Sequence, residues 1–147
     1  MDAQAQLDRF IDRFAPDTAA LARALLAKMR GRLPGATLLV YDNYNALAIG
    51  FGATDKASKA VLSLAVYPRW VNLFFLQAAG LSDPQALLKG EGRKVRHVRL
   101  LTAEAFDDPA IEALIAQAVA RSDPPFDPAA EQRLIVKSVS AKQRPRR

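Results

Sequence analysis

The chain has 147 residues, of which half are hydrophobic and 24% are charged, and this composition is typical of a single globular domain. The absence of cysteine excludes disulfides and thiolate metal sites and favours a reducing cytoplasm. The most apolar stretch, residues 71–81, is far shorter than the ~20 residues of a membrane span, and residues 1–13 mix both charge signs unlike a signal peptide. We therefore expect a cytoplasmic protein without a membrane partner.

The positive charge is concentrated at the C-terminal end. Six of the 21 Lys and Arg residues lie from Arg133 onward, where there is no acid, so residues 1–132 are balanced with 15 of each sign. The net charge of +6 therefore belongs to a basic arm on a neutral body. We predict one α+β domain over residues 1–131 and a basic C-terminal strand or arm over residues 132–147, with a disordered end.

The first third of the chain predicts two helices. Residues 7, 10, 11 and 14 are all Leu, Phe or Ile and have the spacing of an amphipathic helix. A second helix begins at Pro16-Asp17 and carries an apolar stripe of Leu21, Leu25 and Met29. We expect Gly31 to end this helix in the left-handed conformation.

After Pro34-Gly35 the pattern predicts consecutive strands. They cover residues 37–41, residues 47–51, a hairpin of residues 61–67 and 70–77, and residues 94–101, while residues 133–139 form a last strand or an extended arm. Asp83 is expected to cap a short helix, and Asp108-Pro109 to begin a longer one. This order indicates an α+β fold, with an antiparallel meander sheet of about five strands packed against N-terminal and C-terminal helices.

Residues 90–100, GEGRKVRHVRL, contain the densest group of cations, with five basic residues among the seven from Arg93 to Arg99. A β-bulge at Arg96-His97 would turn Val95, Val98 and Leu100 inward together and leave the cations outside. Cations beside glycine amides suit a carboxylate or phosphate group, whereas the alternative is a solvated strand face that pairs with nearby acids. The predicted anion site comprises Gly90, Gly92, Lys94, Arg96, His97 and Arg99.

Aromatic residues gather in the predicted meander. Tyr67 and Trp70 flank the hairpin turn, so their rings lie close together and are candidates for the wall of a small pocket or a partner contact. Phe51 is expected in the core. We add Tyr67 and Trp70 to the predicted ligand site.

Enzymatic chemistry has little support in the sequence. His97 is the only histidine, no serine lies in a G-x-S-x-G elbow, and no second metal ligand lies two or four residues from His97. The acids Asp107, Asp108 and Glu112 could form an iron-binding ridge, but capping of the following helix explains them more simply. We predict no catalytic residues, no metal ligands and no cofactor.

The tail offers a possible nucleic-acid contact. Lys137, Lys142, Arg144, Arg146 and Arg147 could add weak, salt-sensitive affinity for RNA, DNA or anionic lipid, or could serve only as a solubilising end.

The stretch YPRWVNLFFLQAAGLSDPQALLKGEGRKVRHVRL resembles the YdhG-like family, the domain-of-unknown-function family numbered 1801. The matching features are Tyr67-Pro68, the strand at residues 71–75, Gly80, Pro84, Leu87-Leu88, Gly90-x-Gly92 and the strand at residues 95–99, and the likeness extends more loosely over residues 7–121. The resemblance implies a compact α+β domain with an antiparallel sheet. One branch of that family is regarded as frataxin-like iron chaperones, but none of its iron ligands can be carried over to a residue here.

Together these features predict a non-enzymatic protein, monomeric or homodimeric, that binds a small anionic ligand or a protein partner through residues 90–99. Frataxin-like iron handling and nucleic-acid association through the tail are the alternatives.

Overall fold

Two helices open the chain, as the spacing of apolar residues predicts. In the computed structural model, which describes residues 1–147, α1 spans Ala3–Asp12 and α2 spans Pro16–Arg32. The Asp2 carboxylate caps α1 by accepting the Ala5 N–H at 2.8 Å. The predicted glycine cap is wrong: Gly31 lies inside α2, which instead closes with a hydrogen bond from the Leu33 N–H to the Met29 carbonyl.

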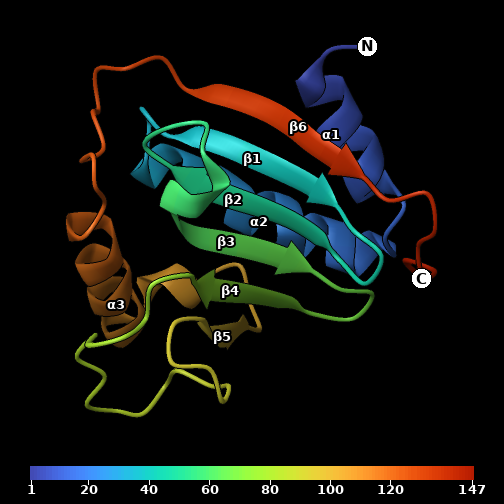
Figure 1. Cartoon of the computed structure of the whole chain (residues 1–147). Helices are drawn as coiled ribbons and strands as arrows, with labels where there is room; N and C mark the ends of the chain where they lie inside the picture. The colour runs from blue at the N-terminus through green and yellow to red at the C-terminus, as the bar shows by residue number, and fades with distance from the viewer.

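Six strands form one sheet, in the order β5-β4-β3-β2-β1-β6 (Figure 1). Their bounds are Thr37–Asp42 for β1, Leu47–Gly52 for β2, Ala60–Val66 for β3, Val71–Phe75 for β4, Arg96–Leu100 for β5 and Arg133–Val139 for β6. The first five strands are an antiparallel meander, which confirms the α+β prediction. The sheet as a whole is mixed, because β6 returns to pair with β1 in parallel.

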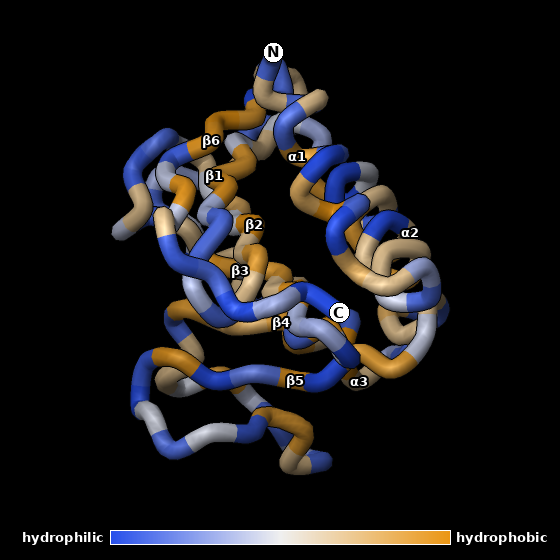
Figure 2. The backbone as a smooth tube through the Cα atoms, turned by 90° about the vertical axis from the view of Figure 1, so that its right-hand side faces the viewer, coloured by the Kyte–Doolittle hydropathy of each residue, from blue (hydrophilic) through white to orange (hydrophobic).

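The helices lie on one side of the sheet, which we call the inner face (Figure 2). The register aligns apolar side chains across this face in rows, such as Leu38–Phe51–Leu62–Phe75 and Val40–Ile49–Leu64–Leu73–Val98. These side chains form one buried cluster with residues of α1 and α2, among them Leu7, Ile11, Leu25 and Met29. Each fully buried side chain of this size contributes roughly 1.5–3 kcal/mol, so the core fixes the register of the whole meander.

The helix after Asp108 forms as predicted, whereas the helix after Asp83 does not. In α3, Pro109–Ala120, the Asp108 carboxylate accepts the Ala110 N–H at 2.9 Å. The Asp83 carboxylate also accepts backbone N–H groups, those of Leu87 and Leu88. However, Ala86 takes the left-handed conformation at φ 53°, so this segment is a turn inside a long loop.

The predicted bulge in β5 is wrong. Each residue from Arg96 to Leu100 has one partner on β4 without a register shift. Alternation therefore buries Val98 and Leu100 on the inner face, while Val95 precedes the paired strand and is 43% exposed. The hairpin of β3 and β4 and the presence of a strand at β5 agree with the sequence prediction.

The opposite side of the sheet, the outer face, has no α-helix over it (Figures 1 and 2). A loop with the short 3₁₀-helix η1, Ala57–Lys59, lies at one end, where the Lys137 Nζ donates to the Asp55 carbonyl. None of the helices in the structure is both long and apolar enough to cross a membrane. The outer face away from this loop carries the candidate site.

Candidate ligand-binding site on the outer face

The regular pairing of β5 divides the predicted cation cluster between the two faces of the sheet. Arg96 alternates with Val98 and Leu100 on the inner side, whereas His97 and Arg99 point to the outer side. The predicted cluster therefore does not form one anion surface. The cluster is divided because β5 pairs with β4 without a register shift, so successive side chains alternate between the two faces.

The Arg96 side chain bonds to the loop that precedes β5. Its Nε donates to the Gly92 carbonyl at 2.9 Å, and with Arg93 it borders a hollow of about 480 Å³ beneath the 78–88 loop. The Asp83 carboxylate also lines this hollow, which reduces its attraction for an anion. Gly90 supports the loop through its φ of 109°, and Lys94 is exposed, with its carbonyl bonded to the Ala78 N–H.

On the outer face, Arg99 joins the two aromatic residues of the hairpin turn. Its guanidinium carbon lies 4.3 Å from the centre of the Trp70 ring, and the Tyr67 ring stacks with Trp70 at 5.5 Å. The neighbouring pair Phe74 and His97 also lies on this face, with ring centres 5.2 Å apart. Tyr67, Trp70, His97 and Arg99 are thus the predicted site residues that the structure brings onto one surface.

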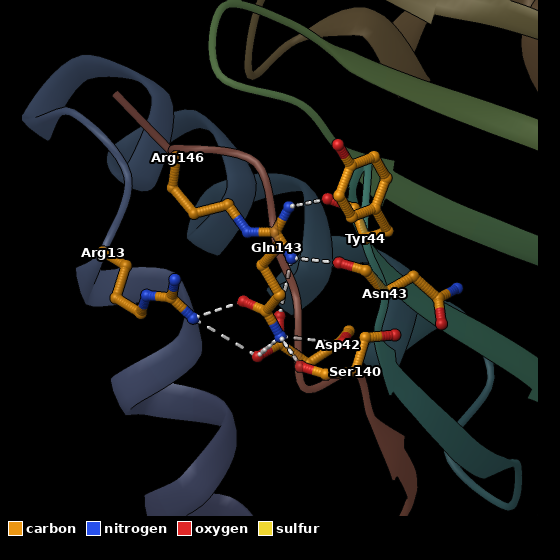
Figure 3. A network of polar contacts seen from close by, with 7 residues as sticks. All are labelled: Arg13, Asp42, Asn43, Tyr44, Ser140, Gln143 and Arg146. Atoms are coloured by element: carbon orange, nitrogen blue, oxygen red, sulfur yellow. Dashed lines mark hydrogen bonds and ion pairs between the residues drawn. The ribbon is translucent and has the colours of Figure 1, made fainter.

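The C-terminal tail, residues 140–147, folds back against the ends of α1 and β1 (Figure 3). Arg146 is buried and donates to the Asp42 carboxylate at 2.9 Å and to the carbonyls of Asn43 and Tyr44. The Gln143 amide contributes a further hydrogen bond to Asp42 at 2.9 Å, and Arg13 lies 3.5 Å from the same carboxylate. Since the side chains of Arg146 and Asp42 are 1% and 2% exposed, this contact is a buried ion pair.

These contacts correct the expectation of a disordered end. A buried carboxylate needs a cationic partner, and the tail supplies one to Asp42. Arg147 also bonds to carbonyls at the end of α1, so the cations of the tail do not form a continuous basic patch. Lys142 stays exposed, and Arg144 lies beside the Tyr44 ring, 5.6 Å from its centre.

The position of the tail creates a hollow that we call the hairpin hollow. It has a volume of about 590 Å³ and is lined by Asn45, Tyr67, Pro68, Arg69, Trp70, Arg144 and Pro145. Three segments build it: the β1–β2 turn, the β3–β4 turn and the tail, which meet at one end of the sheet (Figure 1). Two arginines and no carboxylate line it, so its potential favours an anion, and its volume is in the range of small-ligand sites.

A second hollow, the sheet hollow, adjoins the first and shares Asn45 and Tyr67 with it. It measures about 500 Å³ and lies over β2, β3 and β4. Its floor consists of the short side chains of Ala48, Ser63 and Ala65, and Tyr44 and Phe74 stand among its walls. Small floor residues between aromatic walls leave room for a flat group.

Tyr67 borders both hollows and has a perturbed ionisation. Desolvation by burial raises the pKa of its phenol above the ordinary value of 10.0. The hydroxyl therefore keeps its proton at neutral pH and can donate a hydrogen bond to an anionic ligand.

The acids considered for iron have other partners or positions. Asp108 caps α3, Glu112 pairs with Arg32 at 2.8 Å, and Asp107 lies in the preceding 3₁₀ turn. The structure contains no group of three or more His, Asp or Glu side chains placed to hold a metal ion.

The sequence prediction missed Asn45, Tyr44, Phe74 and Arg69 as neighbours of the site, and it placed Arg144 only in the tail. Alternation in β4 was the available signal, because Asn72 and Phe74 fall opposite to Val71, Leu73 and Phe75. For the tail, the sequence offered only an indirect signal, an acidic residue at an inward position of β1 that needs a cationic partner, and nothing that identified Arg146 as that partner.

Comparisons with protein-family models, with curated proteins and with solved structures found no match to this chain. The resemblance to the YdhG-like family therefore stays a prediction.

Proposed function

We propose that this protein is a non-enzymatic binding protein whose hairpin hollow takes a small anionic ligand that carries a flat ring. One observation carries the proposal: two arginines, Arg69 and Arg144, and two stacked aromatic residues, Tyr67 and Trp70, line the same hollow without a carboxylate. The proposed site lies at the hairpin turn and not in the predicted segment of residues 90–99. Of that segment, Arg99 is near the hollow, because its guanidinium contacts the Trp70 ring.

Each wall of the hollow supplies a different part of the recognition. Arginine presents several N–H donors in a planar fork, which matches the oxygens of a phosphate or carboxylate group. The Tyr67–Trp70 stack offers an apolar face to a ring, and the neutral Tyr67 hydroxyl adds a donor. The geometry therefore supports a ligand in which ring and anion are joined.

The buried Arg146–Asp42 pair gives the hollow its third wall. Arg144 and Pro145 directly precede Arg146, so the ion pair holds them beside the β3–β4 turn. A site built from a preorganised tail loses less conformational entropy on binding than a mobile arm would.

Titration of the fluorescence of Trp70, the single tryptophan, tests the proposal. The probes are thymidine monophosphate, thymidine as the ring alone and inorganic phosphate as the charge alone. We expect the monophosphate to bind more tightly than either part, and Arg144→Ala to weaken it about tenfold or more, the loss of a hydrogen bond to a charged group. Lys142→Ala removes a charge from the same tail without touching the hollow and should bind as wild type. Equal affinity of Arg144→Ala and Lys142→Ala for the monophosphate would refute the proposal.

A further inference from the structure

The hairpin hollow adjoins the sheet hollow, and aromatic side chains line both. Asn45 and Tyr67 line both hollows, so the hollows lie side by side. We call the two together the trough, which extends from the β3–β4 turn onto the outer face over β2, β3 and β4. Tyr44 and Phe74 line the sheet hollow, Trp70 lines the hairpin hollow, and Tyr67, which stacks on Trp70, lines both. The trough thus has three separate aromatic surfaces, Tyr44, Phe74 and the Tyr67–Trp70 stack, which we call its aromatic stations.

The charge of this face has one sign. Among all residues of the six strands the only acid is Asp42, which pairs across from Leu47 on the inner face and is neutralised by Arg146. The outer-face positions carry Arg99 on β5 and Arg133 on β6. Arg69 and Arg144 add two cations at the turn end. A polyanion along this face therefore meets cations and no strand carboxylate.

We propose that the trough binds single-stranded nucleic acid, with successive bases on the three aromatic stations and the phosphates beside Arg69, Arg99 and Arg144. The proposal rests on the function proposed above, since the hairpin hollow becomes the site of one nucleotide. A sheet face with partly exposed aromatic rings and flanking cations is the kind of surface that stacks unpaired bases. Duplex nucleic acid does not fit, because its bases are already stacked and cannot reach the rings.

The short side chains at the floor of the sheet hollow leave room for a base. Ala48 pairs across from Ala65, and Ser63 pairs across from Phe74, so short side chains lie next to the aromatic wall. A base placed against Phe74 therefore meets no large side chain from β2 or β3. A leucine at Ala48, which is only partly buried, would fill this space without changing any charge.

The test compares thymidine monophosphate with oligo(dT) of increasing length and with a duplex, by Trp70 fluorescence at several salt concentrations. We expect affinity to rise with length up to about four nucleotides, the lower end of known single-strand site sizes. Tyr44→Ala and Phe74→Leu should each weaken binding of an eight-nucleotide oligo(dT) about 5- to 150-fold, the range for one stacked base. Ala48→Leu should weaken it comparably. Arg144→Ala should lower the slope of log affinity against log salt by about 0.7. Arg9→Ala, an exposed cation of α1, is the matched charge control and should change neither affinity nor slope.

The possible failures are distinguishable. If the monophosphate binds in an Arg144-dependent manner but the oligonucleotide binds no more tightly, the single-strand proposal is overturned and the small-ligand function stands. If oligonucleotides bind but Tyr44→Ala, Phe74→Leu and Ala48→Leu have no effect, the trough is not the site. Binding of duplex as tight as that of single strand would also overturn the proposal, and absence of all binding would remove both proposals. Far-UV circular dichroism of each variant confirms that it is folded.

Discussion

The buried pair of Arg146 and Asp42 makes a quantitative prediction about the tail. Arg146→Met keeps the unbranched apolar part of the side chain near Phe14, whose ring centre lies 5.7 Å from the guanidinium carbon. It removes the ion pair and the hydrogen bonds to two carbonyls of the β1–β2 turn. Loss of one partner of a buried ion pair costs about 3–5 kcal/mol, because the other charge stays buried.

The remaining contacts of Asp42 place the expected cost at the lower end of that range. The Gln143 amide still donates to the carboxylate, and Arg13 lies 3.5 Å away with a side chain that is 47% exposed. We therefore expect Arg146→Met to lower the free energy of unfolding by about 3 kcal/mol, which for a chain of this size corresponds to a decrease in melting temperature of about 10 °C.

Urea unfolding followed by far-UV circular dichroism measures this loss, with Lys142→Met as the control in the same tail. The double variant Asp42→Asn with Arg146→Met should lose less stability than the sum of the single losses, since the two residues share one interaction. A loss below about 0.5 kcal/mol for Arg146→Met, the range of ordinary surface substitutions, would refute the folded-back tail.

Two further predictions concern glycine positions and the partly buried phenol of Tyr67. A Cβ at Gly35 would lie 1.7 Å from the Asp127 carbonyl oxygen, so Gly35→Ala should lower the free energy of unfolding by about 1–3 kcal/mol. A Cβ at Gly31, inside α2, would have no atom within 4 Å, so Gly31→Ala should raise it by up to about 1 kcal/mol. Equal stability of the two variants in urea unfolding would contradict the fold around Gly35. Because the pKa of Tyr67 is raised above 10.0, the native state retains this proton longer than the unfolded chain does, so its contribution to stability is present below pH 10.0 and is lost as the pH rises through the raised value. Ultraviolet titration of phenolate absorbance in wild type and Tyr67→Phe should give a difference curve with a midpoint above 10.0, and a midpoint at or below 10.0 would contradict the desolvation of the Tyr67 phenol.

Local patterns predicted the meander because each strand carries its own alternation. Leu47, Ile49 and Phe51 alternate with small residues, and Pro68-Arg69 interrupts two β-forming runs, so the first strands and the hairpin follow from short windows of sequence. The pairing of β6 did not follow, because Arg133–Val139 has a strand composition that is compatible with either edge of the sheet. Its partner β1 lies nearly one hundred residues earlier in the chain.

The tail and the site depended on long-range contacts of the same kind. Cations and proline in the last residues favoured disorder, and their composition does not show that Asp42 needs a partner. A signal did exist, since Asp42 follows Leu38 and Val40 at the period of two and so falls on the apolar inner face. A carboxylate in that position requires a cation from elsewhere in the chain.

The most direct test of the central claim is an NMR titration of isotope-labelled full-length protein with thymidine monophosphate. If the hairpin hollow binds an anion joined to a flat ring, the amide signals of Asn45, Arg69 and Arg144 and the indole N–H signal of Trp70 will shift together and saturate with one dissociation constant. Shifts confined to the loop of Gly92 and Arg96, or no saturable shifts, would contradict the claim.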